Sequence, residues 1–186
     1  REGPQGSMWA AHSDSAGALT GWEERGPEWR GFATAGAKEL FRFGPAGSER
    51  ICITEAAIDA MSLAAIEGLR PDTLYVSTGG GWSPATDEAI RGLAKRANAW
   101  FVAATDNNRQ GDVYADRVRA IAAEASARYA RSRPRADDWN EDLKALTATS
   151  SSGSQTLRPA GSRAPARPPY ECGPDAGERQ EKEIEQ

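Results

Sequence analysis

Strand-like and helix-like segments alternate between residues 50 and 146, and this alternation constrains the fold more than any other feature. Three short apolar strands are expected at residues 50–54, 73–78 and 99–105, with 127–133 as a possible fourth strand, and helices are expected at residues 55–69, 84–97, 112–125 and 139–146. Strict alternation of strand and helix is typical of a parallel sheet with helices on both faces. The sequence therefore predicts an α/β domain with a parallel sheet of about four strands.

Three of the predicted strands end in acidic or glycine-rich residues. Glu55 follows the first strand, Gly79, Gly80 and Gly81 follow the second, and Asp106 follows the third. Because right-handed crossovers bring the carboxyl ends of parallel strands to one edge, where such sheets bind ligands, we expect these residues to share a site. Two alternatives remain open: Glu55 could interact only with its helix dipole, and Asp106 could begin a polar turn.

Oxygen ligands for a metal ion follow the third and fourth strands. One residue separates Asp106 from Asn108, so in an extended segment their side chains point the same way and could bind Mg²⁺. Asp138, within "DDWN", is either a third acid facing the metal or a helix cap. Arg133 and Arg135 precede it and could contact phosphates, with a solvated, self-paired charge run as the alternative.

The glycines at 79–81 could form a flexible phosphate cradle, because their backbone N–H groups can approach an anion at a helix start. The stretch lacks the Lys-Ser/Thr of a P-loop and the spacing of a dinucleotide-binding motif. A generic nucleotide-binding fold therefore remains one hypothesis for this edge of the sheet.

Taken in order, the acid after the first strand, the Asp-Asn-Asn after the third and the late "DDWNEDL" resemble the Toprim domain, over about residues 50–146. That domain is shared by bacterial primases, topoisomerases, some nucleases and recombination proteins. The stretch Gly21–Gly44 leading into "ICITEAAIDAMSLAAIEG" further resembles plasmid and integrated-element proteins in which an uncharacterised domain precedes Toprim. The resemblance implies a Rossmann-like Toprim fold with a small β-rich segment before it.

The resemblance also implies roles for individual residues. Glu55 matches the Toprim glutamate, a general base in nucleotidyl transfer or general acid in strand cleavage, and Asp106 matches the first Mg²⁺-binding aspartate. Asn108 stands where a second aspartate is usual, so one negative charge is missing; Asp112 is a possible substitute. Asp138 resembles the late acidic position, and Asp137 beside it is an equally near match. The implied cofactor is Mg²⁺, with Mn²⁺ as an alternative.

Two functions follow from this resemblance. The first is a Mg²⁺-dependent domain acting on phosphodiester bonds of DNA or nucleotides, by primase-like transfer or nuclease-like cleavage, in a plasmid or mobile-element protein. The second is a non-catalytic Toprim module that docks nucleic acid or protein with a weakened metal site. Expected partners are DNA or nucleotides and other domains or proteins of a replication or transfer apparatus.

The composition divides the chain into four expected parts: a disordered segment 1–18, a β-rich remnant of a preceding domain 19–48, the Toprim domain 49–148, and a disordered low-complexity tail 149–186. The net charge of −4 gives no overall basic field to attract nucleic acid. The two cysteines and one histidine are too few for a zinc cluster. No apolar run reaches the ~18 residues of a membrane span, so we expect a cytoplasmic protein.

Overall fold

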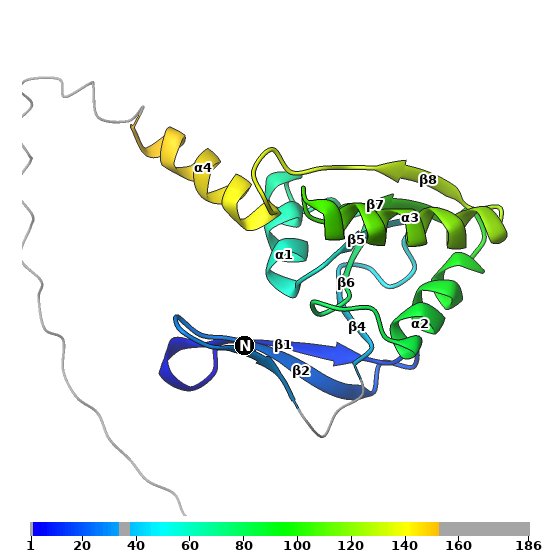
Figure 1. Ribbon diagram of the computed structural model, residues 1–186, viewed down its shortest axis with the longest axis horizontal. Coiled ribbons are helices and arrows are strands. Elements are labelled where there is room, and N and C mark those ends of the chain that lie inside the picture. Colours follow the sequence, from blue (N-terminus) through cyan, green and yellow to red (C-terminus); the bar gives the residue numbers. More distant parts are fainter. Residues whose placement is uncertain (1, 34–37, 153–186) are drawn as a thin grey trace, which may run out of the picture.

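The computed structural model describes residues 2–33 and 38–152, which form one eight-stranded sheet with four α-helices around it (Figure 1). After a short 3₁₀ turn (Pro4–Gly6), the strands are β1 (Met8–Ser13), β2 (Leu19–Arg25), β3 (Arg30–Phe32), β4 (Leu40–Phe43), β5 (Arg50–Thr54), β6 (Thr73–Ser77), β7 (Trp100–Ala103) and β8 (Arg128–Arg131). The helices are α1 (Ala57–Ile66), α2 (Pro84–Ala94), α3 (Arg109–Glu124) and α4 (Trp139–Ser152). The strand order is β3-β2-β1-β4-β6-β5-β7-β8.

The second half of the sheet is parallel. β5 pairs in parallel with β6 and β7, and β7 pairs in parallel with β8. Every residue of β5 and β6 is buried, as expected for strands that helices cover on both faces. The predicted α/β class and parallel sheet are therefore confirmed.

The helices lie on both faces of this parallel half. On one face Ile90 of α2 and Val118 of α3 join a buried apolar cluster with Ile53 of β5. On the other face Leu63 of α1 and Trp139 of α4 join a second cluster with residues of β4 to β7. α1 and α4 therefore lie on one side of the sheet, and α2 and α3 lie on the other.

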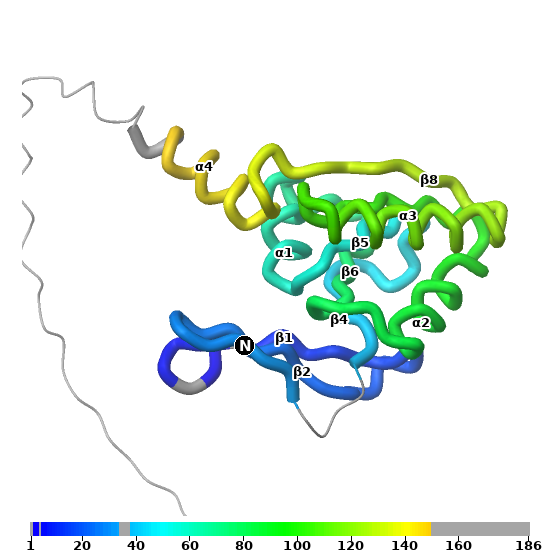
Figure 2. The backbone as a smooth tube through the Cα atoms, in the orientation of Figure 1, coloured from blue at the N-terminus to red at the C-terminus, as the bar shows by residue number. Residues whose placement is uncertain are grey.

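The first half of the sheet is antiparallel and continuous with the second. β4 pairs with β6, β1 pairs with β4, and β2 and β3 follow outward, all antiparallel. Figure 2 traces the chain from these N-terminal strands to β8 at the opposite edge. The residues expected to be a remnant of a preceding domain therefore extend the sheet of the predicted Toprim domain.

One prediction about the N-terminal segment is wrong. Residues 1–18 were expected to be disordered, whereas Met8–Ser13 form β1 between β2 and β4. Its hydrogen-bond partners come from two other strands, so a short sequence window does not reveal it. At the other end α4 continues to Ser152, past the expected domain limit at residue 148, and the remainder of the predicted tail lies outside the described residues.

Within the described residues no helix has the length and apolar character needed to cross a membrane.

Candidate functional site

Glu55 and Asp106 lie side by side where β5 and β7 end. The Asp106 backbone N–H donates a hydrogen bond of 3.2 Å to Glu55 Oε1. Burial raises the pKa of Glu55, and the charge of Asp59 raises it further, while the hydrogen bond from Asp106 opposes this shift. Glu55 is therefore a partly buried carboxyl group with a raised pKa at a strand end.

Asp106 presents an unsatisfied oxygen. Its Oδ1 is buried without a hydrogen-bond partner, and burial together with the charges of Glu55 and Asp138 raises the pKa of Asp106 to about 7. Its backbone carbonyl accepts a 3.0 Å hydrogen bond from Arg131, whose guanidinium also bonds the carbonyls of Ala103 and Thr105. Arg131 thus fixes the backbone on which the Asp106 carboxyl sits.

Asp59 is a third acid at this position, more deeply buried than Glu55 and Asp106, and the sequence interpretation missed it. It is 4% exposed, its Oδ1 has no hydrogen-bond partner, and its pKa is raised to about 7 by burial and by the charges of Asp106 and Asp138. Its spacing gave only a weak signal: Glu55 precedes Ala56, the N-cap of α1, so the two acids do not share a helical turn. We call Glu55, Asp59, Asp106 and Asp138 the acidic rim.

The remaining predicted ligands have structural partners. Asn108 is exposed and caps α3, its Oδ1 accepting a 2.9 Å hydrogen bond from Gly111 N. Asp138 Oδ1 accepts from Glu141 N at the start of α4 at 2.8 Å, yet its charge still acts on Asp59 and Asp106. Asp112 pairs with Arg131 and Arg133, so its charge is directed to these arginines.

The residues predicted to bind phosphate form two groups, the glycines at 79–81 and the arginines at 133 and 135. Gly79 and Gly80 adopt positive φ, and Gly80 N donates a 2.7 Å hydrogen bond to the carbonyl of Glu55, so the glycine loop contacts the rim. A side chain at Gly79 would collide with His12, because a Cβ would lie 2.8 Å from that ring. Gly81 faces Lys38 Nζ, whose distance to a Cβ there would be 3.6 Å.

The two predicted arginines are exposed. Arg133 forms a 2.7 Å ion pair with Asp112, and Arg135 uses its backbone N–H to bond Asp142 on α4. Their role as phosphate ligands stays a prediction.

The N-terminal strands contribute two charged residues that the sequence interpretation also missed. Glu23 of β2 is 5% exposed; its Oε1 accepts a 2.6 Å hydrogen bond from Arg25 and its Oε2 accepts a 3.2 Å bond from Ala57 N at the start of α1. Burial opposes ionisation of Glu23, but contacts with His12, Arg25 and Ala57 outweigh it and lower its pKa. The sequence around β2 did not predict the contact of Glu23 with Ala57, because these two residues are 34 positions apart in the chain.

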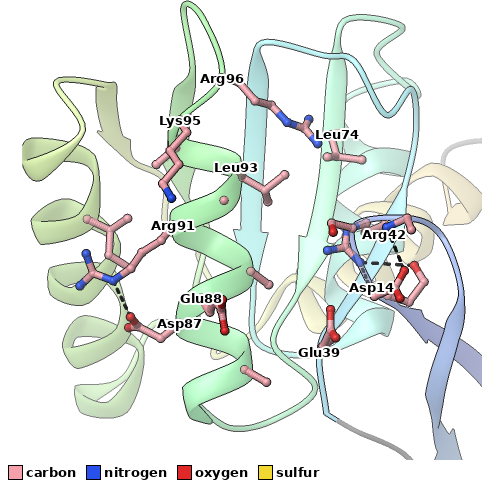
Figure 3. Close-up of a pocket in the computed structure, with 18 of the residues that line it drawn as sticks. Asp14, Glu39, Arg42, Leu74, Asp87, Glu88, Arg91, Leu93, Lys95 and Arg96 are labelled. Atoms are coloured by element: carbon pink, nitrogen blue, oxygen red, sulfur yellow. Dashed lines mark hydrogen bonds and ion pairs between the residues drawn. The ribbon is translucent and has the colours of Figure 1, made fainter.

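A groove of about 1470 Å³ lies elsewhere, between α2 and the loop that joins β1 to β2 (Figure 3). Charges of both signs line it, among them Arg42, Arg96, Asp14 and Glu39. None of the predicted site residues lines this groove, so it does not mark the site that the strand ends form.

The acidic rim fits a hard divalent cation. Among the described residues no three acidic, histidine or cysteine side chains already converge into a metal cluster. Mg²⁺ needs no such cage, because it binds through one or two carboxylates and keeps several waters. Asp59 and Asp106 each have an unsatisfied oxygen, and the pKa values of both are raised in part by neighbouring negative charges, which a cation would offset.

The raised pKa values predict a pH dependence of stability. A carboxyl group that holds its proton more tightly when folded stabilises the fold below its unfolded pKa and loses this contribution as the pH rises through its folded pKa. For Asp59 and Asp106 the window runs from about pH 4 to about pH 7. Each acid contributes about 1.4 kcal/mol per pH unit, so we expect the free energy of unfolding of the metal-free protein to fall by about 1–3 kcal/mol per pH unit, relative to the Asp59→Asn/Asp106→Asn double variant.

Denaturant titrations of both proteins across this pH range test the prediction. A constant difference in the free energy of unfolding between the two proteins would show that the acids titrate as in the unfolded chain.

Comparison with known proteins supports the fold. Residues 52–143 match a family model described as Toprim-like, and residues 1–49 match a model described as a protein of unknown function (DUF3991). No curated protein sequence matches the chain.

Solved primase structures share the fold. The primase fragment of the bacteriophage T7 primase-helicase protein is 15% identical, with a TM-score of 0.53, over 81% of this chain and 62% of that one. The Aquifex aeolicus primase, comprising zinc-binding and RNA polymerase domains, is 14% identical, with a TM-score of 0.53, over 78% of this chain and 38% of that one.

A third similar structure is that of bacteriophage T7 lagging-strand DNA polymerase interacting with primase domains bound to an RNA/DNA hybrid and dTTP. It is 20% identical, with a TM-score of 0.54, over 77% of this chain and 72% of that one. At these identities the likeness establishes the fold. The chain spans 62% of the T7 primase fragment and less of the Aquifex primase.

Proposed function

Because residues 52–143 are a Toprim-like domain preceded by a DUF3991 region at residues 1–49, we propose that this chain is a primase-like domain that acts on phosphodiester bonds of DNA or nucleotides with Mg²⁺. The observation that carries the proposal is the acidic rim, in which Glu55 contacts Asp106, the charge of Asp59 acts on Glu55 and the charge of Asp138 acts on Asp106. The resemblance of the N-terminal strands to plasmid and integrated-element proteins supports a role in replication or transfer of such DNA.

The residues of the rim have separable roles in this proposal. Asp106 and Asp59 would hold Mg²⁺ through their unsatisfied oxygens, and Asp138 would add negative charge. The bound ion would neutralise charge that develops on a phosphoryl oxygen. Glu55, whose pKa is raised, would move the proton, as base in bond formation or acid in bond cleavage.

Titration of the full chain with Mg²⁺ and Mn²⁺ tests the metal site. We expect Asp106→Asn to weaken Mn²⁺ binding by roughly tenfold or more, because an amide retains one oxygen but loses the charge. Asp116→Asn is the matched control: Asp116 is an exposed acid of α3 that pairs with Arg119, and its loss is expected to leave metal binding unchanged.

One observation favours the second function, a non-catalytic docking module. Asn108 replaces an expected acid, and its oxygen is engaged in capping α3. If millimolar Mg²⁺ or Mn²⁺ shows no binding that depends on Asp106, the catalytic proposal is wrong and the docking module takes its place.

A further inference from the structure

We infer that Glu23 is a positioning residue of the metal site, which holds the charge of Arg25 away from the position that the metal takes. The inference rests on the proposed metal site. In this inference the N-terminal strands keep the charge of Arg25 away from the acidic rim, so that a metal cation can bind there.

The first step is that Glu23 is fixed in place. Its Oε2 accepts a 3.2 Å hydrogen bond from the backbone of Ala57, and it lies 3.9 Å from Nε2 of the fully buried His12. Ala56, the N-cap residue of α1, forms no side-chain cap of its own. Glu23 therefore caps α1, whose first residue is Ala57, and the Ala57 N–H anchors the Glu23 carboxylate.

The second step is that Glu23 holds Arg25. Arg25 Nε lies 2.6 Å from Glu23 Oε1, and the Arg25 side chain is 32% exposed. Arg30 is the register partner of Arg25 on β3, so two positive charges stand opposite each other at this end of the strands. The carboxylate of Glu23 offsets that repulsion and fixes the direction of the Arg25 guanidinium.

The third step is that Arg25 is close to the rim. Glu23 joins the Arg25 guanidinium to the backbone N–H of Ala57, which lies between Glu55 and Asp59 in the chain. Asp59 and Asp106 each keep a buried oxygen without a hydrogen-bond partner, so a guanidinium released from Glu23 could turn toward them. The guanidinium and a divalent cation would then compete for the same oxygens.

The experiment is a double-mutant cycle on the full chain with Mn²⁺ binding as the readout. Glu23→Gln preserves shape and an oxygen for Ala57 N–H but removes the charge that holds Arg25. We expect it to weaken Mn²⁺ binding roughly threefold to tenfold, because a released positive charge then lies near the acids. Adding Arg25→Gln to this variant is expected to restore the affinity of the wild type, because the competing cation is gone.

Restoration distinguishes positioning from a structural role, since loss of the cap or of packing would leave the double variant as weak as the single one. Thermal unfolding checks that both variants fold. Wild-type affinity in Glu23→Gln would overturn the inference, as would a double variant that stays weak. If Asp106→Asn binds Mn²⁺ as tightly as the wild type, the proposed metal site itself is wrong, which is a different result from either of these.

Discussion

Replacing Glu55 by glutamine is expected to lower the rate of phosphodiester chemistry at least about a hundredfold while leaving the fold intact. General acid–base catalysis contributes roughly 10²–10⁴ to such reactions, and an amide cannot exchange the proton. Glutamine retains an oxygen that can accept the hydrogen bond from Asp106 N, so the strand ends should stay together. The effect should therefore appear mainly in the rate, while the loss of one negative charge beside Asp106 weakens metal binding by a smaller factor.

The measurement needs two assays with Mg²⁺, because the direction of the chemistry is open: nucleotide incorporation on a single-stranded template, and cleavage of labelled DNA. Glu88→Gln is the matched control, since Glu88 is an exposed acid on α2. An active wild type whose rate survives Glu55→Gln would remove Glu55 from the mechanism and favour a site at the glycine loop.

Gly111→Ala is expected to cause a large loss of stability. A Cβ at this position of α3 would lie 2.1 Å from the backbone oxygen of Asp106 and 3.0 Å from its nitrogen, and backbone atoms cannot move aside as a flexible side chain can. The Gly111 carbonyl also accepts a 2.6 Å hydrogen bond from Thr105 Oγ1. Overpacking of this kind costs about 1–3 kcal/mol, and displacement of Asp106 should weaken metal binding as well.

Gly92→Ala is the matched control for this change, because Gly92 also lies inside a helix but has no atom within 4 Å of a Cβ. There alanine should raise the free energy of unfolding by up to about 1 kcal/mol, through its higher helix propensity. Denaturant unfolding measures both variants. Equal effects of the two substitutions would contradict the close approach of α3 to Asp106.

The parallel half of the fold could be predicted because its signals are local. Each of β5, β6 and β7 is a short apolar run, each is followed by a helical period, and Ser83 with Pro84 starts α2 as expected, the Ser83 hydroxyl accepting from Thr86 N. Alternation of this kind allows few topologies, so the meeting of Glu55 and Asp106 at one edge also followed.

What could not be predicted depends on partners distant in sequence. β1 is held by β2 and β4, and Glu23 bonds Ala57 across 34 residues, so neither has a local signal. Asn108 has a local signal, but that signal is ambiguous. An asparagine at this position could be a metal ligand, a turn residue or a helix cap, and only the position of Gly111 N determines where its oxygen is directed.

The pairing of β4 with β6 places the limit between the two family regions inside a sheet, and this has a consequence for how such proteins diversify. Genetic exchange at residue 49 would have to supply a new edge strand in the register of Phe41 with Ser77, together with a carboxylate able to reach the start of α1. A foreign module without the strand would leave β6 as an open edge, which favours aggregation, and one without the carboxylate would leave the Ala57 N–H at the start of α1 without its partner. We therefore expect the two regions to be inherited as one unit, with recombination tolerated outside the sheet.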